Sequence, residues 1–286
     1  MGSENAADFT VMGVVNVTPD SFSDGGLYFD PGAAIAHGLE LEAEGADILD
    51  IGGESTRPGA EPVDAHAELG RVLPVIEGLR EAGAAAQISI DTSKAAVAAH
   101  ALDAGATFVN DVTALRGDPA MAELVAARGV PCCLMHMLGE PRTMQADPRY
   151  DDVVSDIKAF LEARMAFAIA AGVAEEKILL DPGIGFGKTA EHNLELVARL
   201  DELVALGRPV VIGTSRKSFL GRVTGRPVDD RLAATIATNV LAYERGARVF
   251  RVHDVAPVRD ALVIAGATVR RRWPTPTTST TRTLTT

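Results

Sequence analysis

A helix stop, a short turn and a buried strand follow one another in Gly45-Ala46-Asp47-Ile48-Leu49-Asp50-Ile51. Glycine is common just past the end of a helix because it adopts a positive φ without strain. The largely apolar run after it does not alternate with polar residues, as is typical of a parallel strand covered on both faces. A polar segment bounded by glycines, residues 52–59, comes next. The stretch therefore predicts one strand of an α/β sheet with a polar loop at its carboxyl end.

The same arrangement recurs along the chain, since Gly105-Ala106-Thr107 and Gly246-Ala247-Arg248 also precede strand-like runs. Eight such runs are present, at residues 11–15, 47–51, 87–90, 107–109, 131–135, 177–180, 209–212 and 248–252. Segments with helical spacing separate them, at residues 32–44, 65–81, 94–104, 120–127, 151–171, 190–206, 230–245 and 257–267. Eight β-then-α units in about 260 residues favour an α/β fold of the (β/α)8 TIM barrel type, with a doubly wound open sheet as the alternative.

Composition limits the classes of function. Hydrophobic residues make up 47% of the 286, enough for one large buried core. The formal net charge of −12 argues against binding to nucleic acid or to an acidic membrane. No apolar stretch approaches the roughly 20 residues of a membrane span, and residues 1–8 lack the features of a signal peptide. We therefore expect a cytoplasmic protein.

The domain organisation is predicted to be simple. Residues 9–272 form one barrel domain, preceded by a flexible N-terminus at residues 1–8 and followed by a disordered Thr/Pro-rich tail at residues 273–286. The adjacent Cys132 and Cys133 have neither disulfide geometry nor metal-ligand spacing. They are interpreted as small core residues of a reducing compartment.

Polar groups follow every predicted strand. Active sites of such barrels lie at the carboxyl ends of the strands, so these groups are expected at one rim. Any one of them would suit a solvated loop or a helix cap, but the set of eight strand ends predicts a function. The groups are Asn16, residues 52–59, Asp91, Asn110 with Asp111, His136, Asp181, Ser215 to Lys217, and Arg251 with His253.

Two kinds of chemistry are represented in this set. Asp91, Asn110 and Asp181 offer acceptors and an amide to a flat heterocycle, because a carboxylate accepts two parallel hydrogen bonds from an amidine-like edge. Asp91 also precedes Thr92-Ser93, which are alternative caps for the next helix. Positive charge is expected from Lys217, Arg251, His253 and Arg57, which suit a diphosphate bound beside Mg²⁺.

Three further interpretations concern the loops and two single residues. Asn16 offers one neutral oxygen to a hard cation that keeps its waters and phosphate ligands. His136 is interpreted as a structural, hydrogen-bonded histidine. The polar segments at residues 18–26 and 52–59 are expected to be mobile and to close over a substrate.

Eight segments, taken in order, resemble the signatures of the dihydropteroate synthases. The resemblance spans about residues 11–265. The eight segments are Asn16-Val17-Thr18-Pro19-Asp20-Ser21-Phe22-Ser23-Asp24-Gly25-Gly26, Asp50-Ile51-Gly52-Gly53-Glu54-Ser55-Thr56-Arg57-Pro58-Gly59, Ile90-Asp91-Thr92, Val109-Asn110-Asp111-Val112, Leu134-Met135-His136-Met137, Asp181-Pro182-Gly183-Ile184-Gly185-Phe186-Gly187-Lys188, Ser215-Arg216-Lys217-Ser218-Phe219-Leu220-Gly221 and Arg251-Val252-His253-Asp254-Val255.

This resemblance implies a transferase of the alkyl and aryl class in folate biosynthesis. Its substrates would be 6-hydroxymethyl-7,8-dihydropterin diphosphate and p-aminobenzoate, and its products 7,8-dihydropteroate and pyrophosphate. It further implies a (β/α)8 barrel, a homodimer, Mg²⁺ as the metal, and sulfonamides as competitors of the aryl amine.

The family's site residues carry over by position. Asp91, Asn110, Asp181 and Lys217 would hold the pterin, and Asn16 would lie on the magnesium side. Arg251, His253 and Arg57 would face the diphosphate, and Met135 and Gly213 would make further substrate contacts. The p-aminobenzoate pocket would be framed by Thr56, Arg57, Pro58, Phe22, Phe186 and Ser218.

The resemblance also suggests a mechanism, in which the diphosphate departs before the aniline nitrogen attacks. Asp91, Lys217, Arg251 and His253 would be the catalytic residues. One departure stands out: after Asn110-Asp111-Val112 the family usually has Ser-Gly, and this chain has Thr113-Ala114. Alanine adopts positive φ less readily than glycine, so this loop is expected to shift. The alternatives are a pterin-binding methyltransferase, which would not need a diphosphate site, and a non-catalytic pterin-binding paralogue.

Overall fold

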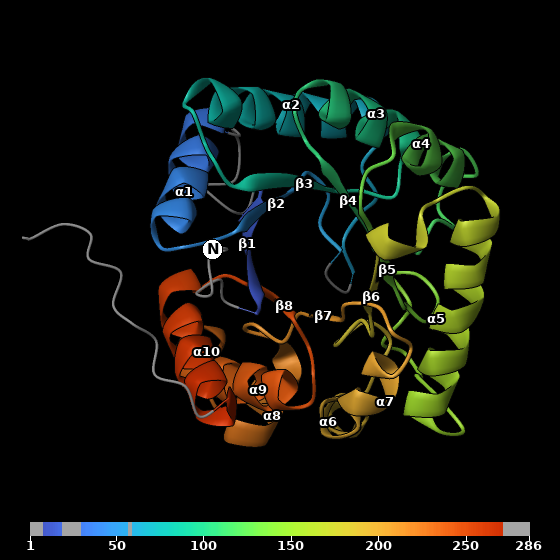
Figure 1. Ribbon diagram of the computed structural model, residues 1–286, viewed down its shortest axis with the longest axis vertical. Coiled ribbons are helices and arrows are strands. Elements are labelled where there is room, and N and C mark those ends of the chain that lie inside the picture. The colour runs from blue at the N-terminus through green and yellow to red at the C-terminus, as the bar shows by residue number, and fades with distance from the viewer. Residues whose placement is uncertain (1–7, 19–29, 57–58, 271–286) are drawn as a thin grey trace, which may run out of the picture.

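The computed structural model describes residues 8–18, 30–56 and 59–270 (Figure 1). Within them eight parallel strands pair in the order β6-β5-β4-β3-β2-β1-β8-β7, and an isolated parallel bridge between Leu180 and Val210 joins the two edges. This closure confirms the predicted (β/α)8 barrel and excludes the open sheet. The strands are β1 Thr10–Asn16, β2 Ile48–Gly52, β3 Gln87–Asp91, β4 Phe108–Asp111, β5 Cys132–Met135, β6 Ile178–Asp181, β7 Val211–Ile212 and β8 Val249–Val252.

Helices surround the barrel on its outside (Figure 1). They are α1 Pro31–Ala43, α2 Ala65–Glu81, α3 Ala95–Asp103, α4 Met121–Arg128, α5 Val153–Ala170, α6 Ala190–Ala198, α7 Leu200–Val204, α8 Ser218–Thr224, α9 Leu232–Glu244 and α10 Val255–Arg270. Short 3-10 turns lie at Glu175–Lys177 and Val228–Asp230.

The predicted helix over residues 190–206 was wrong in one respect, because it breaks into α6 and α7 at Arg199. The Arg199 guanidinium pairs there with three carboxylates, those of Asp152, Glu195 and Glu202. The short helix α8 was not predicted, since its seven residues are too few to show helical periodicity.

The repeated Gly-Ala turn is confirmed at all three places. Gly45, Gly105 and Gly246 have φ values of 102°, 114° and 102°. In each case the following alanine N–H donates to a carbonyl five residues earlier, at 2.9, 2.9 and 3.0 Å. This bond satisfies a carbonyl of the last helical turn and redirects the chain into the next strand.

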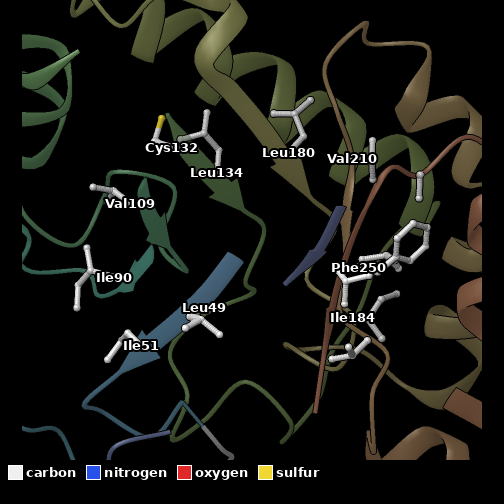
Figure 2. Packing of buried hydrophobic residues seen from close by; sticks show 14 of the residues in the cluster. Leu49, Ile51, Ile90, Val109, Cys132, Leu134, Leu180, Ile184, Val210 and Phe250 are labelled. Atoms are coloured by element: carbon white, nitrogen blue, oxygen red, sulfur yellow. The ribbon is translucent and has the colours of Figure 1, made fainter. Parts of the chain in front are cut away.

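Side chains alternate along each strand between two apolar layers. Leu49, Ile51, Ile90, Val109 and Leu134 belong to the large cluster between the strands and the helices (Figure 2). A smaller cluster fills the barrel interior with Met12, Ile48, Phe108, Cys133, Val211 and Val249. Because successive strand residues face opposite sides, Asp50 and Arg251 must also point into the barrel.

Three smaller expectations have outcomes in the structure. Both cysteines are buried free thiols, and burial raises their pKa, as expected of core residues. Asp8, placed in the flexible N-terminus, instead accepts a hydrogen bond from the Tyr243 hydroxyl at 2.8 Å. The other N-terminal residues and the Thr/Pro-rich tail lie outside the described residues. Within the described ranges, no helix has both the length and the hydropathy to cross a membrane.

The loop after β4 takes a left-handed turn without glycine, since Ala114 and Leu115 have φ values of 54° and 60°. The Asp111 carboxylate supports it by accepting from the Thr113 N–H at 2.8 Å and from the Leu115 N–H at 2.9 Å. Arg164 Nε donates to the Ala114 carbonyl at 2.8 Å. These bonds compensate for the strain that alanine carries at positive φ, which costs roughly 1 kcal/mol or more.

Candidate active site

Neighbouring strands bring the predicted polar residues into one layer at the carboxyl rim of the barrel. Asn16 of β1 is in register with Gly52 of β2, which is in register with Asp91 of β3. Asp91 is in turn in register with Asn110 of β4. The three polar side chains therefore belong to adjacent or nearly adjacent strands at the same height, as the sequence predicted.

Arg251 of β8 is in register with Met12 of β1, and its side chain bonds to two carboxylates. Its Nε donates to Asp50 Oδ2 at 2.6 Å, and its Nη2 donates to Asp91 Oδ2 at 2.8 Å. Asn110 Nδ2 also donates to Asp50 Oδ2, at 2.9 Å. Asp91 and Asn110, expected to bind a heterocycle, and the arginine expected to bind phosphate thus belong to one hydrogen-bonded network, which Asp50 joins.

Asp50 is a site residue that the sequence reasoning missed, because it lies inside an apolar strand. Its side chain is completely buried, and its Oδ1 has no hydrogen-bond partner among the described residues. Buried charges in proteins are almost always paired. A carboxylate within one buried strand and an arginine within another were therefore the signal that the two residues form a pair.

Burial raises the pKa of Asp91 to about 7, against the effect of Arg251 and with the help of Asp50, Glu68 and Asp111. Four other charged side chains thus act on this carboxyl group. Asp91 was also considered as a neighbour of possible helix caps, and Thr92 Oγ1 does accept the Lys94 N–H at 3.2 Å. Thr92 therefore accepts the hydrogen bond just before α3, and the Asp91 carboxylate bonds to Arg251 instead.

We expect Asp91→Asn to raise the free energy of unfolding more at pH 8 than at pH 5. A folded-state pKa of about 7 lies above the ordinary value of 3.8, so the folded protein holds a proton that the unfolded chain releases. Stability therefore falls as the pH rises from about 4 to about 7, and asparagine removes this loss. Urea unfolding of both proteins should show a difference on the order of 1 kcal/mol or more between the two pH values. An equal change at both would contradict the raised pKa.

Asp181 ends β6, and its position is fixed by the turn that follows. Its Oδ1 accepts the Gly183 N–H at 2.6 Å, and burial raises its pKa while that N–H, Lys217 and Arg251 lower it. The same turn carries Phe186, and the Lys217 Nζ lies 4.1 Å from the centre of its ring. The predicted residues of β6 and of the β7 loop therefore meet directly, through a cation–π contact.

His136 was interpreted as structural, and its contacts agree. Its Nδ1 lies 3.0 Å from Lys188 Nζ, which also donates to the Phe186 carbonyl at 3.0 Å. Burial, followed by the charge of Lys188, lowers the pKa of His136 to about 2, so the imidazole is a neutral acceptor. Lys188 was not predicted, and its burial lowers its own pKa to about 7. This buried pair joins the loops that follow β5 and β6.

The segment after β7 is strained next to the predicted lysine. Arg216 has a φ of 58°, which is uncommon outside glycine, and its guanidinium holds Asp254 through two bonds of 3.1 and 2.6 Å. Lys217 is the residue just before α8, at its N-cap position, and Ser218 is the first residue of that helix. Gly213 lies opposite Arg251, whose Cβ would be 3.9 Å from a Cβ at that position. Strain of this kind persists where the surrounding structure enforces it and is frequent at active sites.

His253 corrects one expectation, because it does not supply positive charge here. Burial, followed by the charges of Arg251 and Arg216, lowers the pKa of His253 to about 3. Ser215 Oγ accepts the His253 N–H at 3.2 Å and lies 3.0 Å from its Nδ1. The hydroxyl proton is therefore available to Nδ1, which favours the tautomer with the proton on Nε2. His253 offers a neutral N–H donor rather than a cation.

The beginning of the loop after β2 is anchored by a partly buried ion network, in which Glu68 is the fully buried member. Lys94 Nζ donates to Glu54 Oε2 at 2.5 Å and to Glu68 Oε2 at 2.6 Å, and Glu54 Oε1 accepts the Val63 N–H at 2.9 Å. Burial lowers the pKa of Lys94, but the two carboxylates raise it by more. The network fixes the segment that leads to Thr56. Phe22, Arg57 and Pro58 of the predicted aryl-amine pocket lie outside the described residues.

One wall of the rim is apolar. Met135, at the end of β5, clusters with Val112, Met137 and Met144, and Phe186 packs against them. Such a wall beside convergent polar groups is the usual composition of a small-molecule site.

The residues at the rim fit a Mg²⁺ ion that arrives with its phosphate ligands. In the described residues no three His, Cys, Asp or Glu side chains gather closely enough to hold a metal. Mg²⁺ binds readily through one or two protein oxygens together with waters and substrate phosphates. Asn16 ends β1 beside this layer and can provide one such oxygen.

Comparison with known proteins gives consistent matches over nearly the whole chain. Residues 12–253 match the family model described as pterin binding enzyme. The dihydropteroate synthase of Mycobacterium leprae is 49% identical over 269 residues, which cover 91% of this chain and 94% of that protein. The Yersinia pestis dihydropteroate synthase, in a complex with a sulfonamide drug, gives a TM-score of 0.87 at 45% identity, with 91% and 94% of the two chains covered. The Xanthomonas albilineans enzyme in complex with 7,8-dihydropteroate gives 0.82 at 47% identity, with 91% and 93% covered.

Proposed function

The chain belongs to the dihydropteroate synthases, transferases of folate synthesis, and from this membership we propose the chemistry of its own site. It condenses 6-hydroxymethyl-7,8-dihydropterin diphosphate with p-aminobenzoate to give 7,8-dihydropteroate and pyrophosphate. The observation that carries the proposal is the network in which Arg251 meets Asp50 and Asp91, because it places an anion-binding group beside heterocycle-binding groups.

The pterin ring binds to the residues at the ends of β3, β4 and β6. Asp91 and Asp181 accept hydrogen bonds from the amino and ring N–H groups, and the Asn110 amide supplies both a donor and an acceptor. Asn110 and Asp181 are buried and the Asp91 side chain is 12% exposed, so little water competes for these bonds. Lys217, held against the Phe186 ring, closes this side of the pocket with positive charge.

The diphosphate binds on the side of β8. Arg251 presents its guanidinium, and His253 donates from Nε2 because Ser215 engages Nδ1. Mg²⁺, reached by the Asn16 oxygen, supplies further positive charge to the phosphate oxygens when it is bound.

We propose that bond cleavage precedes attack. The leaving diphosphate develops the largest negative charge, and fixed donors aimed at developing charge give the greatest catalytic gain. Asp91 and Asp181 stabilise the pterin-methyl cation electrostatically. The aniline nitrogen of p-aminobenzoate is unprotonated at neutral pH and needs no strong base, so it attacks from the side of Thr56 and Phe186. The new C–N bond replaces the C–O bond, and the aniline proton passes to solvent.

The test is pyrophosphate release by the purified chain. We expect release only when pterin diphosphate, p-aminobenzoate and Mg²⁺ are present together. A pterin-binding methyltransferase would release none, and neither would a non-catalytic paralogue, although both would bind the pterin. Absence of release with all three components would overturn the proposal.

Lys217→Ala is expected to lower turnover and pterin affinity by at least about tenfold. A hydrogen bond from a charged group contributes roughly 1.5–3 kcal/mol, and alanine removes it together with the contact to Phe186. Steady-state kinetics with the pterin diphosphate varied would measure both effects. Wild-type kinetic constants in the variant would show that Lys217 does not contact the substrate.

Two further parts of the proposal concern assembly and location. Large apolar side chains are exposed on α9 and α10, among them Leu241, Ile264 and Val269. Exposed apolar side chains on adjoining helices support association through this face, and we propose a homodimer. We also propose that the protein works in the cytoplasm, which its free cysteines support.

A further inference from the structure

The Arg251 guanidinium is bound by two carboxylates that differ in depth. The Asp50 side chain has no exposed surface, whereas the Asp91 side chain is 12% exposed. Arg251 meets Asp50 through Nε, the nitrogen nearest the chain, and meets Asp91 through the terminal Nη2. The contact with the more deeply buried Asp50 therefore fixes Nε, and the contact with Asp91 engages the terminal Nη2, which faces the rim.

Asp50 accepts hydrogen bonds from two side chains, whereas Asp91 accepts one from Arg251. Asn110 Nδ2 donates to the same Oδ2 of Asp50, so this oxygen orients two side chains at once. Asp91 depends on Arg251 and is surrounded by three other carboxyl groups, those of Asp50, Glu68 and Asp111. Its carboxyl group is also the more exposed of the two, so it is the one that donors from a ligand can reach.

We infer that Asp50 is a positioning residue, which holds Arg251 through Nε while Nη2 exchanges its contact with Asp91 for the diphosphate. This deepens the proposed function and rests on it. The exchange frees the Asp91 carboxylate for the N–H groups of the heterocycle at the moment when Arg251 engages the phosphates. Binding of the two halves of the substrate is thereby coupled through one guanidinium.

The inference predicts effects of opposite sign for the two carboxylates. Electrostatics alone predicts that removing either negative charge tightens the binding of an anion. If Asp50 orients Arg251, its loss weakens binding in spite of this effect. If Asp91 competes for Nη2, its loss strengthens binding. A site in which both carboxylates merely support the fold would weaken in both variants.

The probe is inorganic pyrophosphate with Mg²⁺, measured by isothermal titration calorimetry on the full chain. We expect Asp50→Ala to raise Kd at least about fivefold, a change of about 1 kcal/mol or more. We expect Asp91→Asn to lower Kd about two- to tenfold, a change of about 0.4–1.4 kcal/mol. Asp50→Asn should recover much of the affinity, because its carbonyl can still accept from Arg251 and Asn110. Asp47→Asn is the matched control: Asp47 also pairs with an arginine, Arg259, but precedes β2 at the opposite end of the barrel, so Kd should not change.

A thermodynamic cycle separates positioning from general damage to the fold. In an Arg251→Met background, Asp50→Ala should change the pyrophosphate Kd by less than about twofold, because the residue it positions is gone. The double variant also removes both members of the buried pair, which is better tolerated than removing one. Tighter or unchanged binding in Asp50→Ala alone, or an equal loss in both backgrounds, would overturn the inference. If the wild-type chain itself neither binds pyrophosphate nor releases it from substrates, the proposed function fails first.

Discussion

Gly183→Ala is expected to abolish measurable turnover and to lower the free energy of unfolding by about 2–4 kcal/mol. Gly183 has a φ of 66°, and a Cβ built there would lie 1.9 Å from the backbone oxygen of His136. A backbone atom cannot turn aside as a side chain can, so the loops after β5 and β6 must separate. The Gly183 N–H would then leave Asp181 Oδ1, and the Asp181 carboxylate, proposed to bind the pterin, would lose its orientation.

The control for this prediction is Gly207→Ala. Gly207 has a similar φ of 80°, but a Cβ at that position meets nothing within 4 Å. Gly207→Ala therefore introduces only the strain of alanine at positive φ, roughly 1 kcal/mol, without a clash, and should leave turnover unchanged. Urea unfolding and pyrophosphate release should be measured on both variants. Similar losses in the two would show that strain, rather than the clash with His136, sets the effect.

Arg251→Met is expected to lower turnover at least about 100-fold and stability by about 3–5 kcal/mol. The first effect follows from the loss of the principal donor to the departing diphosphate. The second follows because Asp50 and Asp91 would remain buried without a counter-charge. Single-turnover kinetics and thermal unfolding measure the two effects separately.

Arg259→Met is the matched control at the other end of the barrel. Arg259 pairs with Asp47 at 2.9 Å, and both side chains are about a third exposed. Exposed ion pairs of this kind contribute about 1 kcal/mol or less to stability. Arg259→Met should therefore lower the free energy of unfolding only slightly and leave turnover unchanged. If Arg251→Met and Arg259→Met lower the free energy of unfolding equally, the Arg251 network at the rim contributes no more to stability than an exposed ion pair.

The barrel was predictable because two local signals repeat. Strand-length apolar runs and the Gly-Ala turns are each set by a few neighbouring residues, and their alternation determines the topology. The rim residues followed, since Asn16, Asp91 and Asp181 are the last residues of their strands and Asn110 is the next-to-last residue of β4. Helix ends were less predictable, because the break at Arg199 depends on Asp152, which is distant in the sequence.

The parts of the site that were missed depend on contacts across the closed barrel. Asp50 resembled an ordinary member of a strand until closure brought it to Arg251, 201 residues away. Lys188 follows a glycine-rich segment that does not indicate its environment, and packing against His136 buries it. The charge of His253 could not be predicted either, since it depends on burial and on Arg251.

The most direct test of the account is a crystal structure of the chain with pterin diphosphate and Mg²⁺. It should show the pterin ring bonded to Asp91, Asn110 and Asp181, the phosphates at Arg251 and His253, and the Arg251 Nε still bonded to Asp50. A heterocycle bound away from the ends of β3, β4 and β6, or phosphates away from Arg251, would contradict it.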